Sequence, residues 1–449
     1  MAGLRGALPA VKLRRAPIVI KFGGASLEDP ARVARDVGTV VSEGAPVVVV
    51  ASAREGVTDL LTEALAHPRS RARHRRIVEE IRRRHAGLPP AGRRHVERVA
   101  RLLLDVEQTP GRDAALADRV LSQGERLAVH WLSARLTEHG LPATPVEADH
   151  LGLITDNAYG ASCILLDRSG PAVRRGLGRL LDRGKLPVVT GYFGRSLEGR
   201  VATLGRGGSD YAAAGIGALL GASRVELVKR HVAVLSADPR EVPDARPIPE
   251  LSYEEAEELA QFGARVLHPL TIEPARAHGV TLKVRSLEDP SVVTTIAPPR
   301  AGRRNRALTV LRPLRLLRLR VPGGRQRPGI VAEVSQRLSD AKVNLVQLYT
   351  SSALLCLVLA PGEVVAAIRA LAPVTREAAA MLEGPYRVAL VTVIGDGVLD
   401  DLDRVPSSAL RGVEGFSATP RALSLAVPLA RGSRVLRDLH RALVVREGR

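Results

Sequence analysis

Short apolar stretches that end in glycine turns and alternate with helical segments constrain this fold more than any other feature. Residues 18–26 (IVIKFGGAS) combine an apolar strand with a glycine turn, the helical pattern of 29–44 follows, and 45–53 (APVVVVASA) form a second strand. Comparable apolar runs recur at 185–194 and 225–239. Apolar strands separated by helices are typical of a mostly parallel sheet sandwiched by helices. We therefore predict the α/β class, with ligands bound at the carboxyl ends of the strands, where the glycine turns lie.

The chain is too long for a single core, because 449 residues indicate two to four domains. Residues 297–306 (APPRAGRRNR) are rich in Pro, Gly and Arg and indicate a linker. The pattern before the linker predicts a large α/β domain at 18–300, preceded by a basic tail at 1–17. The pattern after it predicts a β-α-β-β-α module at 308–375 and a weaker, degenerate copy at 384–449. Two modules of this size are typical of paired regulatory domains.

The net charge of +19 raises the question of nucleic-acid binding. Only six of the 66 basic residues are lysines, and the arginines are spread along the chain, as an Arg-rich coding bias would produce. In the densest cluster, residues 68–104, Ile77, Val78 and Ile81 recur at helical spacing, which predicts amphipathic helices with a solvated basic face. Aromatic residues make up 2% of the chain, too few for base-stacking platforms. We therefore rank nucleic-acid binding last and expect no nucleic-acid partner.

The sequence also argues against a membrane or secreted protein. No run approaches the roughly 20 apolar residues of a membrane span, and the basic start lacks the apolar core of a secretory signal. Cys163 and Cys356 are the only cysteines, so there is no disulfide framework or Cys-rich metal site. We expect a cytoplasmic protein with no membrane partner.

Lys21 and the turn that follows it are the first candidate for chemistry. Gly23 and Gly24 allow the backbone to approach phosphate oxygens closely, and the exposed N–H groups of such a turn bind anions. A lysine beside them can neutralise charge on a transferring phosphoryl group. Taken alone, the same fragment is equally consistent with an ordinary strand-to-helix turn.

Further motifs that follow along the chain make the functional interpretation of this turn more specific. They are QGERL around Glu125, GRGGSD around Arg206, SADPR ending at Arg240, and FGARVLHP around Arg265. Together with the Lys-Phe-Gly-Gly turn, they resemble the aspartate kinases of the amino-acid kinase superfamily over residues 18–296. The tail resembles the paired ACT domains of that family. The resemblance implies an amino-acid-kinase-like sheet followed by two small α+β ACT-like domains.

The resemblance also implies an activity and a set of site residues. The activity is ATP-dependent phosphorylation of the L-aspartate side chain to 4-phospho-L-aspartate, the first step toward lysine, threonine and methionine, with Mg²⁺ bridging the phosphates. Lys21 would be the catalytic residue. The substrate-binding positions are Thr58, Glu125, Arg206, Ser209 and Asp210. The nucleotide-binding positions are Lys21, Gly23, Gly24, Ser26, Lys229, Arg230, Arg240 and Arg265.

Three departures from the family pattern leave alternatives open. Ala25 replaces a threonine, Arg265 replaces a lysine, and residues 229–233 (KRHVA) replace Thr-Asp-Val-Asp-Gly. Two carboxylates are thus exchanged for cations that would attract a triphosphate. The alternatives are a catalytically silent relative that binds an amino acid and regulates a partner, and a kinase with another amino-acid substrate or phosphate donor.

The sequence also gives expectations for an effector site and for metal binding. Lys342-Val343-Asn344 matches the Gly-Val-Asn of an ACT domain, so the resemblance implies Asn344 as a contact for an amino-acid effector, lysine or threonine, and a homo-oligomer. His74, His85 and His95 lie in the Arg-rich helices without the spacing of metal ligands, so we predict no protein-bound metal.

Overall fold

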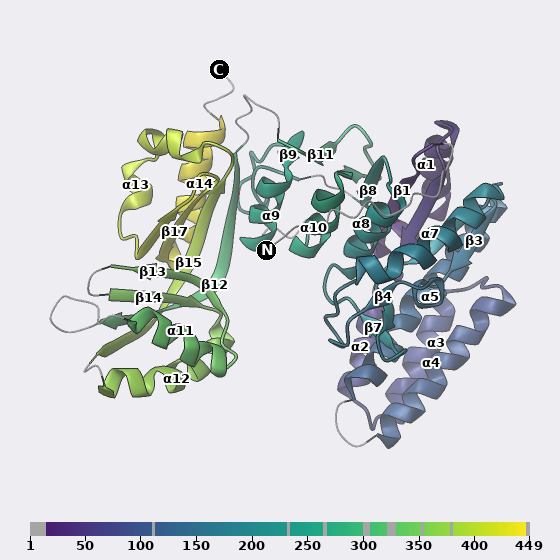
Figure 1. The fold of residues 1–449 in the computed structure, drawn as a ribbon, viewed down its shortest axis with the longest axis horizontal. Helices are drawn as coiled ribbons and strands as arrows, with labels where there is room; N and C mark the ends of the chain where they lie inside the picture. The colour runs from purple at the N-terminus through teal and green to yellow at the C-terminus, as the bar shows by residue number, and fades with distance from the viewer. Residues whose placement is uncertain are drawn as a thin grey trace. The chain divides into compact units, whose positions relative to one another are not determined.

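The chain forms two compact units (Figure 1). The structure is a computed structural model that describes residues 15–109, 113–230, 234–263, 267–299, 306–320, 329–351, 354–377 and 380–445. The first unit comprises Met1–Val234, Pro249–Glu257 and Val266–Pro299, and the second comprises Leu235–Ile248, Glu258–Arg265 and Arg300–Arg449. No helix within these described ranges is both long and apolar enough to cross a membrane.

An eight-stranded sheet in the order β3-β5-β2-β1-β8-β10-β11-β9 organises the first unit. β1 lies parallel to both β2 and β8, and among the adjacent pairs only β10 with β11 is antiparallel. The mostly parallel α/β sheet predicted from the sequence is therefore confirmed. The strands of this sheet are β1 (Ile18–Phe22), β2 (Val47–Ala51), β3 (Ala143–Val146), β5 (Leu186–Thr190), β8 (Arg224–Lys229), β9 (Glu250–Ser252), β10 (Thr281–Ser286) and β11 (Val293–Ala297). A small second sheet joins β4 (Ile154–Thr155), β6 (Phe193–Ser196) and β7 (Val201–Thr203).

Helices cover both faces of the large sheet. They are η1 (Gly24–Glu28), α1 (Pro30–Ser42), α2 (Val57–Ala66), α3 (Arg71–Arg84), α4 (Pro90–Gln108), α5 (Ala114–Glu138), α6 (Ala148–Leu151), α7 (Leu166–Asp182), α8 (Gly208–Leu220), α9 (Tyr253–Gln261) and α10 (Pro269–His278). Ile18, Ile20 and Phe22 of β1 face a core shared with α1 and α5. Because side chains alternate along a strand, Lys21 faces the other side, where α8 packs on β1 and β8.

The Arg-rich stretch forms α3 and α4, as its periodicity predicts. Ile77 and Ile81 are fully buried in the core that these helices share with α5, while neighbouring arginines such as Arg82 and Arg83 form ion pairs at the surface. The basic charge of this stretch is thus carried by the outer face of amphipathic helices.

The second unit is built on one six-stranded antiparallel sheet in the order β13-β14-β12-β15-β17-β16. Its strands are β12 (Ala307–Arg320), β13 (Leu345–Thr350), β14 (Leu354–Leu359), β15 (Met381–Ile394), β16 (Gly415–Ala418) and β17 (Ala422–Pro428). Its helices are α11 (Ile330–Asp340), η3 (Pro361–Glu363), α12 (Val364–Glu377), η4 (Val398–Arg404), α13 (Ser407–Leu410), η5 (Leu429–Arg431), α14 (Gly432–His440) and η6 (Arg441–Val445).

Both modules of the tail share this sheet. β12 pairs with β15 from Ala307 to Arg320, with two register shifts, and its residues 315–320 also pair with β14 on the other side. α11 and α12 pack in one apolar core and α14 in another. The two small α+β regions predicted from the sequence therefore join through their longest strands.

Residues 235–248 also pack in the second unit, although they precede the predicted linker. Ala237 and Val242 lie in the core that contains α14, and Ser236 Oγ lies 2.9 Å from His440 Nε2. At the end of the linker, buried Arg306 pairs with Asp401 at 2.7 Å.

Candidate active site

Lys21 lies near the carboxyl end of β1, where its ammonium group forms an ion pair with Asp210. The distance between Lys21 Nζ and Asp210 Oδ1 is 2.7 Å, and both side chains are more than 90% buried. Asp210 belongs to the first turn of α8, which follows the glycine turn at 205–208. The parallel sheet thus brings the end of one strand to the start of a helix almost 190 residues further along the chain.

A second lysine approaches the same carboxylate from β8. Lys229 Nζ lies 2.7 Å from the other oxygen of Asp210. Burial alone would raise the pKa of Asp210, but the charges of Lys21 and Lys229 outweigh it and hold that pKa well below its ordinary value. Burial lowers the pKa of Lys229, against the attraction of Asp210. With one carboxylate between two ammonium groups, the cluster carries an excess positive charge that suits a phosphate group.

Glu125 of α5 lies in a different environment, made of amide and hydroxyl donors. Its Oε1 accepts a hydrogen bond from Ser209 Oγ at 2.6 Å, and its Oε2 accepts the backbone N–H groups of Gly191 and Tyr192 at 2.5 Å each. Burial raises the pKa of Glu125 to about 7, against these hydrogen bonds and the charge of Lys21. Both oxygens are therefore engaged with the protein, and Glu125 anchors the start of α8 to the turn after β5.

Two glycines permit the close backbone approaches of this region. A Cβ atom at Gly24 would lie 2.5 Å from the carbonyl oxygen of Ala53, and one at Gly191 would lie 2.8 Å from Ser209 Cβ. A side chain at either position would push apart the turns that end β1, β2 and β5. Beside Gly24, Ser26 Oγ is buried and has no hydrogen-bond partner among the described residues, so it can donate to a ligand.

The remaining predicted site residues that the structure describes have exposed side chains. Thr58 and Arg206 are exposed, at the start of α2 and in the turn before α8. Arg230 is exposed beside Glu288, at an N···O distance of 3.6 Å. Arg240 belongs to the second unit and makes a two-point contact with Asp238. Arg265 falls outside the described residues.

Sequence reasoning missed one residue that organises the site, Asp118 of α5. Asp118 accepts hydrogen bonds from the Thr203 backbone N–H and hydroxyl, each at 2.7 Å, and from the Gly160 N–H, so it holds the strand leading to the GRGGSD turn. Its position seven residues before Glu125, on the same face of a helix, is a signal that could have found it. His268 caps α10 by accepting the Leu270 N–H, and burial lowers its pKa.

The chain is similar to known proteins over most of its length. A model of the amino acid kinase family matches residues 16–286, more than half of the chain. An aspartokinase of Thermus thermophilus is 30% identical over 340 residues, which are 72% of this chain and 82% of the relative. The lysine-sensitive aspartokinase 3 of Escherichia coli is 30% identical over 360 residues, 76% of this chain and 78% of the relative.

A solved structure agrees over almost the whole chain. E. coli aspartokinase III in complex with aspartate and ADP superposes with a TM-score of 0.80 at 26% identity, covering 95% of this chain and 99% of that one. This chain therefore belongs to the amino acid kinase family and is a phosphotransferase. Within the family it belongs to the aspartokinases, as the motifs around Lys21, Glu125 and Asp210 predict.

Proposed function

We propose that this protein transfers the terminal phosphate of ATP to the side-chain carboxylate of L-aspartate, giving 4-phospho-L-aspartate in the cytoplasm. The observation that carries the proposal is the cluster of Lys21, Asp210 and Lys229 at the carboxyl ends of β1 and β8, beside the glycine turn. The E. coli relative, whose structure holds aspartate and ADP, has the same fold.

Little proton chemistry is needed for this transfer. The accepting carboxylate is ionised at neutral pH, so catalysis consists of positioning and of charge stabilisation. Lys21 lies where it can neutralise charge on the phosphoryl group as it moves. Its ion pair with Asp210 fixes the ammonium group, because both side chains are buried.

The substrate side is proposed around the start of α8. Arg206 and Thr58 are exposed and free to turn toward a substrate carboxylate, which a guanidinium binds through two parallel hydrogen bonds. Ser209 and Asp210 contact the amino acid from the first turn of α8. Glu125 contributes by holding Ser209, since both its oxygens already accept hydrogen bonds from the protein.

The nucleotide side is proposed along the glycine turn and the end of β8. Gly23, Gly24 and Ser26 present backbone and hydroxyl donors to phosphate oxygens, and Lys229 and Arg230 supply charge. Arg240 and Arg265 are assigned to this side by the family resemblance. Mg²⁺ would arrive bound to ATP, because the two buried carboxylates of this region, Glu125 and Asp210, are already engaged by protein donors.

A hydroxylamine-trapping assay tests the proposal. Purified protein with Mg·ATP and L-aspartate should form aspartyl hydroxamate, and Lys21→Ala should abolish the product. The matched control is Lys185→Ala, which removes an exposed lysine before β5 and should leave the rate unchanged. No product from the intact protein would overturn the proposal, and calorimetry showing aspartate binding without ATP binding would then indicate a silent amino-acid-binding relative.

We further propose that the tail binds an amino-acid effector and joins copies of the chain into a homo-oligomer. Asn344 is exposed directly before β13, where an effector can reach it. Lysine is favoured over threonine because the E. coli relative is lysine-sensitive. Inhibition by lysine that is lost in Asn344→Ala would support this, and inhibition by threonine alone would contradict it.

A further inference from the structure

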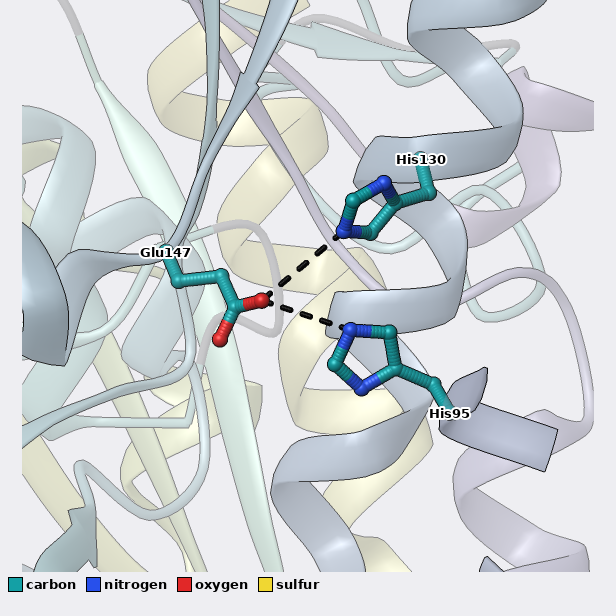
Figure 2. A group of neighbouring side chains, drawn as sticks. All are labelled: His95, His130 and Glu147. Atoms are coloured by element: carbon teal, nitrogen blue, oxygen red, sulfur yellow. Dashed lines mark ion pairs between the residues drawn. The ribbon is translucent and has the colours of Figure 1, made fainter. Parts of the chain in front are cut away.

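Two histidines and a glutamate from three separate segments converge in the first unit (Figure 2). His95 comes from α4, His130 from α5, and Glu147 from the residue between β3 and α6. Glu147 Oε1 lies 3.3 Å from His95 Nε2 and 3.8 Å from His130 Nε2. All three ligand atoms lie within 4.8 Å of one another, so one point is within reach of all three.

A hydrogen bond at the far ring nitrogen of His95 turns its other nitrogen toward this point. Gln123 donates its side-chain N–H to the carbonyl of Arg119 at 3.1 Å, which turns the amide oxygen of Gln123 toward His95 Nδ1 at 3.2 Å. That oxygen can only accept, so His95 Nδ1 carries a proton and Nε2 is the ring nitrogen that faces Glu147. Fixing the tautomer through the far ring nitrogen is how proteins prepare a histidine for a metal.

Charged side chains of both signs surround these three residues. Glu147 uses its second oxygen to pair with Arg126, which also pairs with Asp149 at 2.6 Å. Arg94 of α4 also acts on both rings, and Arg98 acts on His95. An ion would therefore be held by its three ligand atoms and not by an excess of negative charge.

We propose that His95, His130 and Glu147 bind a zinc ion, or a divalent transition metal of the same type, through two imidazole nitrogens and one carboxylate oxygen. Two His and one Glu are an established ligand set for Zn²⁺, with a solvent molecule in the fourth position. The side chains are 13–17% exposed, so an ion can enter. Bonds of about 2.0–2.2 Å to a single ion would draw the three ligand atoms closer together than the 4.8 Å within which they now lie. The sequence-based expectation of no metal site overlooked this set because its members are 35 and 17 residues apart.

Such an ion would join α4 and α5 to the connection after β3. These residues are distinct from the proposed catalytic cluster, and the expected effect of the metal is on stability. The inference therefore has a readout independent of kinase activity.

Competition with a chelating dye on the full-length protein, using Zn²⁺ alone as the probe, tests the proposal. One equivalent of Zn²⁺ should bind per chain and raise the melting temperature. His95→Ala and Glu147→Gln should each weaken binding by about a hundredfold or more and remove the thermal shift, since loss of a supporting group alone weakens metal sites by about 10–100-fold. Gln123→Leu, which removes the tautomer-fixing acceptor, should weaken binding by about tenfold.

Two further measurements make the result decisive. His150→Ala is the matched control, because His150 is largely exposed and faces the other oxygen of Glu147 at 3.5 Å; it should leave affinity unchanged. Co²⁺ should give the visible absorption of a four-coordinate site in the wild type and lose it in Glu147→Gln, which has nearly the same shape. No stoichiometric binding, or an equal loss in His150→Ala and His95→Ala, would overturn the proposal.

Discussion

Two carboxylates lie close together at the start of α8, and their surroundings shift their pKa values in opposite directions. Glu125 sits among amide and hydroxyl donors and has its pKa raised to about 7, because burial outweighs its hydrogen bonds. Asp210 is equally buried, but Lys21 and Lys229 lower its pKa. Neutral donors are thus insufficient to keep a buried acid ionised, whereas two adjacent ammonium groups are sufficient. Glu125 therefore holds the turn in place, and Asp210 sets the charge of the site.

Removing the charge of Asp210 should have the largest effect. Asp210→Asn removes the counter-charge of buried Lys21 and of partly buried Lys229. Breaking a buried ion pair in this way costs about 3–5 kcal/mol. We expect that loss in the free energy of unfolding, measured by chemical denaturation. The control is Glu79→Gln, which breaks the exposed pair with Arg82 and should change stability by less than about 1 kcal/mol. Equal changes in the two variants would contradict the buried cluster.

The pH dependence of stability separates the two carboxylates. Folded protein keeps a proton on Glu125 up to about pH 7, whereas the unfolded chain releases it near 4.5, so this group lowers stability as pH rises between those values. The expected loss is about 3 kcal/mol. Asp210 has the opposite sign: its lowered pKa stabilises the fold above pH 3.8 and the contribution is lost in stronger acid. Unfolding curves of wild type and Glu125→Gln should converge at low pH and diverge toward pH 7.

Removing Lys229, the second lysine beside Asp210, tests the charge of the site through nucleotide binding. A unit charge about 8 Å from a phosphate contributes about 2 kcal/mol at an effective dielectric of ~20. Lys229→Thr should therefore raise the KM for ATP more than tenfold while Lys21 keeps Asp210 ionised. Steady-state kinetics in ATP measure this. Lys185→Ala, at an exposed position before β5, should leave that KM nearly unchanged, and an equal effect there would contradict a specific role of Lys229 in nucleotide binding.

The smallest expected effect comes from a single hydroxyl. Ser209→Ala removes one donor to Glu125, which should lower stability by about 1 kcal/mol and raise the pKa of Glu125 further. Ser133→Ala is the matched control, because the buried Ser133 hydroxyl has no hydrogen-bond partner among the described residues. Thermal unfolding of the two variants at pH 6 should differ; identical midpoints would argue against the Ser209 contact.

Local patterns carried much of the prediction. The apolar runs that became β1 and β2 and the periodicity of α3 are properties of short windows, so they could be read without the fold. The Lys21 turn and the GRGGSD turn could be named as site elements because each motif is contiguous. The partners of Glu125 could not be foreseen, since Gly191 and Ser209 reach it only through the packing of α5 and α8.

The sequence by itself determined the α/β class, the family and the residue types of the phosphate turn, because these depend on hydrophobic periodicity and on contiguous motifs. Tertiary structure decided the charge state of each carboxylate, the assignment of residues 235–248 to the second unit and the meeting of His95, His130 and Glu147. The physical reason is that burial and electrostatic interaction act through space, between groups that chain packing brings together from distant positions.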